Sequence, residues 1–111
     1  MAMTAEKEEG KGRKEEEKLG IRIIDRHPSQ SRLAELGIRS WPKWGCPPGK
    51  FALKYDAQET CYLVKGKVRV CVKGSSDYVE LTAGDLVVLP KGLSCIWDVS
   101  VAVDKHYTFD N

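Results

Sequence analysis

The sequence has little histidine, no Cys-x-x-Cys pair and no long apolar run, and each absence excludes a class of protein. The only histidines are His27 and His106, and the cysteines at 46, 61, 71 and 95 have no zinc-finger spacing. No apolar run approaches the roughly 20 residues of a membrane-spanning helix. The N-terminus lacks the apolar core of a secretory signal. We therefore expect a soluble, cytoplasmic protein with free thiols and no membrane partner.

A concentration of positive charge is also missing. Charged residues make up 31% of the 111 residues, yet the net charge is only +2, and no block of lysine and arginine stands free of acids. Nucleic-acid binding needs basic residues gathered on one face. The composition therefore disfavours nucleic acid and leaves small molecules or other protein chains as expected partners.

The first 18 residues, "MAMTAEKEEGKGRKEEEK", are nearly all charged or small. Such a segment cannot bury enough apolar surface to offset the entropy lost on ordering. The sequence therefore predicts a disordered charged tail over residues 1–18 and a single folded domain over residues 19–111.

Beyond the tail, short β-rich runs follow one another. They include "GIRIID", "KFALKY", "ETCYLV", "KVRVCV", "YVELT", "LVVLP", "SCIWDVSVAV" and "KHYTF", separated by turn residues. Lys65 and Gly66 predict a tight hairpin turn, and Ser29 or Ser31 can begin a short helix that Gly37 ends. "SWPKWGCPPGK" is predicted as a rigid connection. The expected fold is all-β, an antiparallel sandwich or small barrel with one short N-terminal helix.

Two spaced motifs sharpen this fold. Glu59 is followed after six residues by Gly66, and "GDLVVLPKGLSC" has Gly84-x5-Pro90-x-Gly92-x2-Cys95. These resemble the two motifs of the cupin superfamily, G-x5-H-x-H-x3/4-E-x6-G and G-x5-P-x-G-x2-H-x3-N. The phrases "SWPKWGCPPGKF", "ETCYLVKGKV" and "KHYTF" resemble the cupin 3 family, named for the ureidoglycine aminohydrolase cupin domain. The resemblance implies a small jelly-roll barrel, a homodimer, and ureido or amino-acid-like substrates.

The resemblance also implies where a metal would bind, and this chain departs from that pattern. The two histidine positions fall on Leu53 and Tyr55, or on Ala52 and Lys54, depending on the spacer. The third histidine position is Cys95. A tight transition-metal site needs three or four imidazole, thiolate or carboxylate ligands. The sequence therefore predicts a degenerate site without a bound metal or other cofactor, although Glu59, Cys61 and Cys95 could converge on a metal, with His106 as an outside candidate.

By strand alternation, Cys61 and Leu63 point into the barrel if Glu59 does, and Trp97 and Val99 point into it if Cys95 does. The candidate ligand-binding residues are thus Tyr55, Glu59, Cys61, Cys95, Trp97 and Lys105, with Tyr107 as an alternative to Lys105. The candidate catalytic residues are Glu59, as general acid or base, and Tyr55, as donor to an oxyanion. Trp97 could stack on a planar or cationic ligand, or could simply fill the core.

Three functions remain open at this point. The first is a single-domain cupin that binds a small polar metabolite in its barrel pocket, with or without metal-independent chemistry. The second is a metal-dependent enzyme of aminohydrolase or isomerase type that uses Glu59 and Cys95. The third is a dimeric, non-catalytic scaffold whose barrel is plugged. Trp41 and Trp44 could plug the bottom of the barrel or line an interface between two copies. For the tryptophans, the alternative is packing inside the monomer, which we expect for at least one of them.

Overall fold

The computed structural model describes residues 15–110, and most of them belong to strands. Within this range, eight strands form, together with one α-helix and one 3-10 helix. In chain order the elements are β1 (Glu16–Lys18), β2 (Ile21–Asp25), α2 (Gln30–Leu36), η1 (Ile38–Ser40), β3 (Lys43–Cys46), β4 (Gly49–Lys54), β5 (Gln58–Val72), β6 (Tyr78–Thr82), β7 (Leu86–Leu89) and β8 (Ser94–Asp110). The predicted all-β class with one short helix is confirmed.

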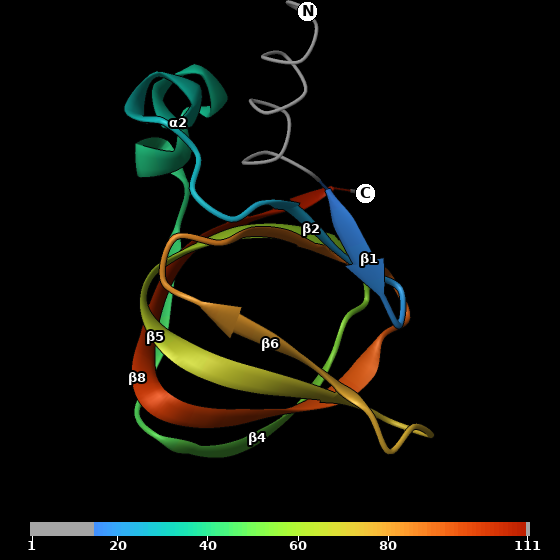
Figure 1. Ribbon diagram of the computed structural model, residues 1–111. Coiled ribbons are helices and arrows are strands. Elements are labelled where there is room, and N and C mark those ends of the chain that lie inside the picture. The colour runs from blue at the N-terminus through green and yellow to red at the C-terminus, as the bar shows by residue number, and fades with distance from the viewer. Residues whose placement is uncertain (1–14, 111) are drawn as a thin grey trace, which may run out of the picture.

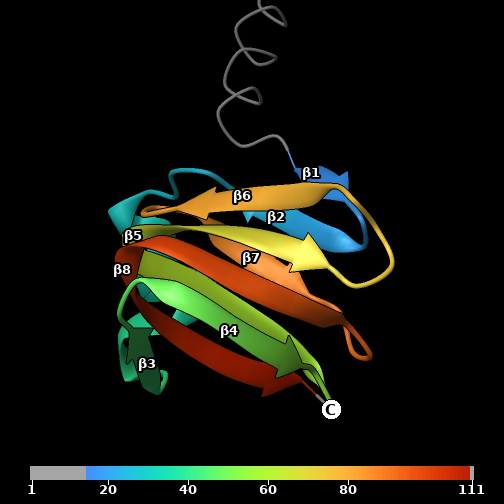
Figure 2. The same cartoon turned by 90° about the horizontal axis from the view of Figure 1, so that it is seen from below.

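The strands form an antiparallel jelly-roll barrel in which β5 and β8 are shared by both sheets (Figure 1). One sheet has the order β1-β2-β7-β5-β8-β3 and uses the beginning of β5 and the end of β8. The opposite sheet is made by β6, the end of β5, the beginning of β8 and β4. Figure 2 shows the strands side by side from below. Because both long strands curve around the barrel, no hairpin is needed between the two sheets.

That curvature corrects two predictions. Lys65 and Gly66 do not form a hairpin turn, because β5 continues through them as a single strand with register shifts against β8. Gly66 has φ +109°, and a Cβ at this position would lie 2.5 Å from the Ala102 carbonyl oxygen. The glycine therefore serves a bulge where two backbones approach closely, rather than a turn. Likewise, "SCIWDVSVAV" and "KHYTF" are one strand, β8.

Two further short strands lie where none was predicted. Lys43–Cys46, inside the expected rigid connection, pairs with β8 as β3. Glu16–Lys18 forms β1 and pairs with β2, so ordered structure begins before Leu19. Residues 1–14 of the predicted tail, and residue 111, lie outside the described part of the chain. Pairing, rather than apolar composition, explains β1, because all three of its residues are exposed.

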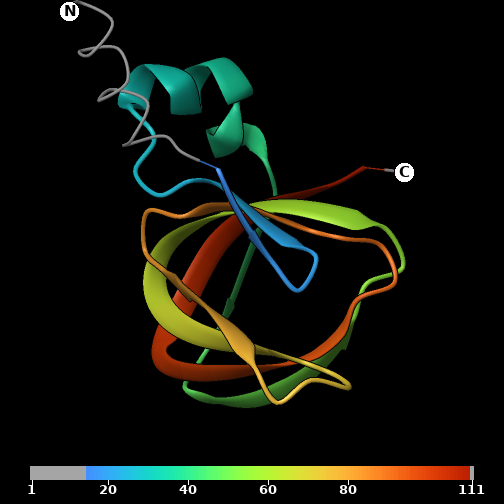
Figure 3. The ribbon, with the colours of Figure 1, turned by 45° about the vertical axis from the view of Figure 1, so that its right-hand side comes forward.

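The helical segment is as expected and lies outside the barrel (Figure 3). Ser29 caps α2 by accepting a hydrogen bond from the Arg32 amide, and Gly37 ends it in the left-handed conformation at φ +69°. Within residues 15–110, neither helix is long and apolar enough to cross a membrane.

The core lies between the two sheets. Alternate residues of β5 and β8 point inward, as predicted for Glu59, Cys61 and Leu63 and for Cys95, Trp97 and Val99, all of which are buried. The apolar residues of this core include Ile21, Val68, Val70, Leu81, Val87 and Leu89. They fill the space between the sheets beneath a cavity at one end of the barrel.

Candidate functional site

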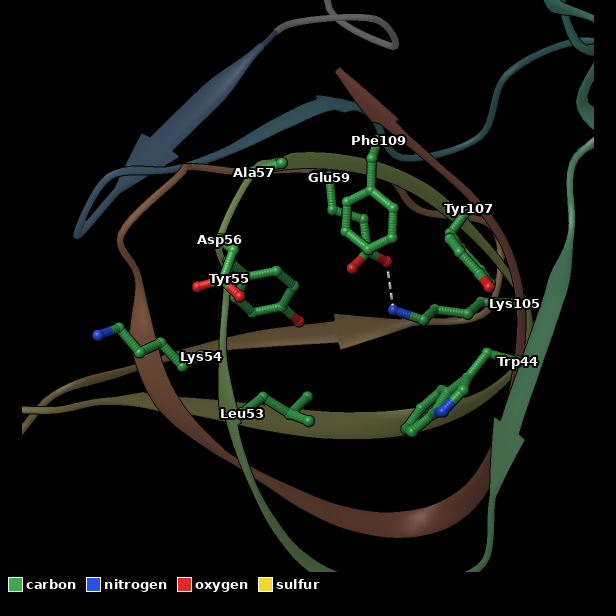
Figure 4. Close-up of a pocket in the computed structure, with 10 residues that line it drawn as sticks. All are labelled: Trp44, Leu53, Lys54, Tyr55, Asp56, Ala57, Glu59, Lys105, Tyr107 and Phe109. Carbon is green, nitrogen blue, oxygen red and sulfur yellow. Dashed lines mark hydrogen bonds and ion pairs between the residues drawn. The ribbon is translucent and has the colours of Figure 1, made fainter. Parts of the chain in front are cut away.

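A cavity of about 510 Å³ lies at the open end of the barrel (Figure 4). Its walls come from β3, β4, β5, β8 and the connection between β4 and β5. The lining residues are Trp44, Leu53, Lys54, Tyr55, Asp56, Ala57, Glu59, Lys105, Tyr107 and Phe109. This volume is in the range of small-molecule sites, and a concave, mostly apolar cavity with a few polar groups is their usual form.

A buried ion pair forms the polar floor of the cavity. The Lys105 ammonium donates to Glu59 Oε2 at 2.5 Å, and each residue is only 4% exposed. Glu59 comes from β5 and Lys105 from β8, which are paired strands. An isolated buried charge would cost several kcal/mol, so each of these groups depends on the other.

Aromatic rings surround the Lys105 ammonium. Its nitrogen lies 4.6 Å from the ring centroid of Trp97, 5.0 Å from that of Trp44 and 5.9 Å from that of Tyr107. Trp44 and Trp97 also pack edge to face, with centroids 5.9 Å apart. The electron-rich faces of these rings favour a cation, so they support the ammonium on the sides that Glu59 leaves open. Trp44 therefore packs inside the monomer, as expected for at least one of the two tryptophans.

Tyr55 contributes a hydroxyl to the same floor. The residue is 6% exposed, and its side chain points inward toward Glu59 and Lys105 (Figure 4). Burial raises the pKa of the Tyr55 phenol well above its ordinary value, and the nearby Glu59 carboxylate raises it further. The group therefore stays protonated and can donate a hydrogen bond. Among residues 15–110, no partner accepts that bond.

Three of the predicted ligand-binding residues do not line the cavity. Cys61 and Trp97 are 0% exposed, and Cys95 is 5% exposed. All three belong to the packed core beneath the floor. Trp97 stacks on Lys105 rather than on space open to a ligand. The structure thus brings together Tyr55, Glu59 and Lys105 of the predicted set, and it adds Tyr107, the predicted alternative to Lys105.

Sequence reasoning missed Trp44 and Phe109 as lining residues. Phe109 packs edge to face on Tyr107, with ring centroids 5.5 Å apart, and is 51% exposed at the rim. Alternation along "KHYTF" carried the signal for Phe109, because positions 105, 107 and 109 share one face of a strand. Trp44 carried no such signal, because β3 was not predicted.

The residues present do not fit the metal site that the fold family implies. Leu53 has no donor atom, and Glu59 is engaged by Lys105. Burial raises the pKa of Cys61 to about 12 and that of Cys95 to about 11, so both thiols are neutral near pH 7, whereas a thiolate is the metal ligand. Within the described residues, no three His, Cys, Asp or Glu side chains are gathered closely enough to hold an ion.

The outside candidate, His106, is also separated from the cavity. Its Nδ1 lies 3.1 Å from the Trp41 carbonyl oxygen, and it alternates with the inward-pointing Lys105 and Tyr107. Since Cys95 points inward, His106 is not placed as its base. The nucleophilic-cysteine arrangement that the sequence left open therefore has no support from this geometry.

Comparison with known protein families identifies the family to which this barrel belongs. Residues 33–107, which include β3 to most of β8 and the whole polar floor, match the EutQ-like cupin domain. The chain belongs to this family. The predicted cupin resemblance is therefore confirmed at the level of fold and family. The ureidoglycine aminohydrolase activity that the resemblance implied stays a prediction.

Solved structures agree with this assignment. A DUF861 family protein from Thermotoga maritima is 40% identical, with a TM-score of 0.71 over 75% of this EutQ-like cupin chain and 93% of its own. A DUF1255 protein of unknown function from Acidithiobacillus ferrooxidans is 28% identical, with a TM-score of 0.55, and the match covers 58% of this chain and 60% of that one.

A more distant structural relative is a putative ethanolamine utilisation protein Q from Salmonella typhimurium. It is 22% identical, with a TM-score of 0.52, and the match covers 59% of this chain and 51% of that one. At this identity the likeness concerns the fold alone, and the match spans about half of the longer protein. No curated protein matches the chain.

Proposed function

We propose that this cupin binds a small polar metabolite in the cavity at the open end of its barrel, without a tightly bound metal. The observation that carries the proposal is the Lys105–Glu59 pair at the cavity floor. In this chain a lysine supplies the positive charge that a metal ion supplies in a histidine-bearing cupin. The ammonium is fixed by Glu59 and by three aromatic rings, so the charge needs no ion from solution.

The orphaned Tyr55 hydroxyl supports a binding role for the floor. A buried donor without an acceptor costs about 1–3 kcal/mol, and such groups are usually satisfied by a ligand or by ordered water. The aromatic rings of Trp44, Tyr107 and Phe109 add a wall on which the body of a ligand can pack. Polar floor and apolar wall together give a pocket both orientation and affinity.

Whether the bound molecule reacts is a separate proposal. If the bound molecule reacts, Glu59 is the general acid or base and Tyr55 is the hydrogen-bond donor, as the sequence indicated. The metal-dependent alternative using Glu59 and Cys95 requires the Lys105–Glu59 pair to open and the Cys95 thiol to ionise. The scaffold alternative and the predicted homodimer stay predictions.

Two measurements test the proposal. Elemental analysis of untagged protein purified without a chelator is expected to find less than one tenth of an equivalent of zinc, iron, manganese or nickel. A stoichiometric metal would contradict the metal-free proposal. A thermal-shift screen against small polar metabolites is expected to find ligands that raise the melting temperature.

The screen has a matched pair of variants. Tyr55→Phe removes the floor hydroxyl, and Tyr62→Phe makes the same chemical change on the opposite face of β5. We expect Tyr55→Phe to reduce the ligand-induced shift and Tyr62→Phe to leave it unchanged. Equal responses in both variants would move the binding site away from the barrel interior.

A further inference from the structure

The floor of the cavity combines one negative, one positive and one neutral polar group, and this combination restricts what can bind. Glu59 and Lys105 are both 4% exposed, so their charges balance in a place that water barely reaches. A ligand group that brought a net charge to this floor would leave one buried charge uncompensated. Such imbalance costs several kcal/mol.

The same three groups offer both kinds of hydrogen bond. The Tyr55 hydroxyl has no acceptor among the described residues, and it stands ready to donate. Glu59 Oε2 accepts from Lys105, and the other oxygen of this carboxylate points away from Lys105, into the cavity (Figure 4). That oxygen can accept a hydrogen bond from a ligand. A ligand that satisfies both protein groups therefore carries a hydrogen-bond acceptor beside a hydrogen-bond donor.

The wall adds a shape requirement. Tyr107 and Trp44 lie on either side of Lys105, and Leu53 lies across the cavity from Tyr107 (Figure 4). The ring planes of Tyr107 and Phe109 are inclined by 67°, so this part of the wall is made of aromatic edges and faces. A flat, apolar ligand body is the partner that such a wall accommodates.

The mouth does not select for charge. Lys54 and Asp56 border the cavity itself. An adjoining shallow pocket of about 270 Å³ shares Asp56 and adds Lys91 and Asp110. Because both signs are present, no electrostatic field of one sign draws in anions or cations.

Resting on the proposed function, we infer that the pocket recognises an uncharged group with a hydrogen-bond acceptor beside a hydrogen-bond donor, carried on a flat apolar body. The acceptor receives the Tyr55 hydroxyl, and the donor meets the free oxygen of Glu59. A carboxamide and a hydroxyl-bearing carbonyl compound both present this pattern. The Lys105–Glu59 pair stays closed when the ligand is bound.

The test uses three probes of nearly equal shape and different charge with the full-length chain. Benzamide is neutral, benzoate carries −1 and benzamidine carries +1. We expect benzamide to bind at least about tenfold more tightly than either ion near pH 7, a ratio that corresponds to about 1.4 kcal/mol. Chemical-shift perturbation by NMR, titrated to millimolar probe, gives each affinity and shows whether Tyr55 and Glu59 amides respond. α-Hydroxyacetophenone, a hydroxyl-bearing ketone, is a further neutral probe, and tighter binding of this compound than of benzamide would favour the hydroxyl-bearing carbonyl class.

Charge-altering variants should reverse the order. Glu59→Gln leaves Lys105 unopposed, so benzoate should become the preferred probe. Lys105→Met leaves Glu59 unopposed, so benzamidine should become the preferred probe. Tyr55→Phe keeps the ion pair and should weaken benzamide about tenfold without changing the order of the two ions. If either ion-pair variant does not fold, the order of probe affinities in the wild-type protein and the effect of Tyr55→Phe still test the inference.

The outcomes separate this inference from the proposed function. Benzoate or benzamidine binding the wild-type floor as tightly as benzamide would overturn the inference and leave the cavity a binding site. Perturbations confined to residues far from the cavity, for these probes and for the metabolite panel alike, would overturn both.

Discussion

The two ends of the barrel interior are built from the same strands by the same alternation, yet they differ in chemistry. At the closed end, inward positions of β5 and β8 carry Val68, Val70 and Val99, all at most 3% exposed. At the open end, the inward positions of the same strands carry Glu59 and Lys105. The closed end is an apolar core that tolerates no water, while the open end holds two opposite charges at nearly the same burial.

Burial alone therefore does not distinguish the core from the candidate site in this protein. Glu59 at 4% exposure is as buried as much of the core around it. What differs is the partner: a core side chain needs apolar neighbours of the right volume, whereas Glu59 needs one particular residue on β8. Substitutions at the ion pair, at the β5 bulge, at the buried thiols and at the rim should therefore differ in their effect on the free energy of unfolding.

The largest effect is expected at the polar floor. Lys105→Met leaves Glu59 as a buried, uncompensated charge, and we expect a loss of about 3–5 kcal/mol in the free energy of unfolding. Urea denaturation measures it. In the double variant Glu59→Leu/Lys105→Met, the open end becomes apolar like the closed one, and most of the loss should be recovered. A Lys105→Met loss below about 1 kcal/mol would show that the pair is not buried in solution.

The next largest effect on stability is expected at Gly66, where β5 bulges. In Gly66→Ala the new methyl carbon would lie 2.5 Å from the Ala102 oxygen and 2.7 Å from the Val103 Cα, so the backbones must separate. We expect a loss of about 3 kcal/mol or more from strain and crowding combined.

Gly74→Ala is the matched control for Gly66→Ala. Gly74 also has a positive φ, of +87°, but a Cβ there meets nothing within 4 Å. Its cost should be about 1 kcal/mol, from backbone strain alone. Equal losses in the two variants would mean that the close approach of β5 and β8 at Gly66 contributes nothing.

An intermediate effect is expected from the two buried thiols beneath the cavity floor as the pH rises. Burial raises the pKa of Cys61 to about 12 and that of Cys95 to about 11, from 9.0. A raised pKa in the folded state means that the unfolded chain releases these protons first, so stability is full below pH 9 and falls as the pH rises toward 11–12.

Between pH 8 and pH 10 we expect a loss of about 3 kcal/mol from the two thiols together. Urea unfolding under reducing conditions, repeated at each pH, measures this slope. Cys61→Ala should reduce the slope by about half. If the slope is unchanged in that variant, the thiol of Cys61 is not the group that titrates.

The smallest effect on stability is expected at the rim. Phe109→Ser replaces a ring that is 51% exposed, and we expect a change of about 1 kcal/mol or less in the free energy of unfolding. The same change removes part of the apolar wall, so the affinity for benzamide should fall. A variant that loses stability without losing affinity would place Phe109 in the core rather than in the pocket.

Much of the fold could be predicted from local signals. Glu59-x6-Gly66 and Gly84-x5-Pro90 are short-range patterns, and alternation assigned the inward faces of Cys61 and Trp97 correctly. The hairpin at Gly66 was wrong because a glycine that permits a turn also permits a bulge. Only the close approach of Ala102, far along the chain, distinguishes the two.

The site was predicted less well for a related reason. Tyr55, Glu59 and Lys105 were among the predicted residues, but nothing local indicated that Lys105 would pair with Glu59 or that Trp97 would be enclosed beneath it. Both facts depend on the register of β5 against β8, which pairs Leu63 with Lys105. Register is a long-range property that the sequence of either strand alone does not determine.

The pairing of the shared strands β5 and β8 also predicts the order in which the barrel forms during folding. Their pairing begins near Val72 and Cys95, which are close in sequence, and ends at Gln58 and Asp110, which lie 52 positions apart. Zipping from the near end closes short loops first, because loop-closure entropy grows with length. Glu59 and Lys105, 46 positions apart, lie toward the far end. In native-state hydrogen exchange, we therefore expect the pairing around Gln58 and Asp110 to open at lower free energy than the pairing around Val72 and Cys95.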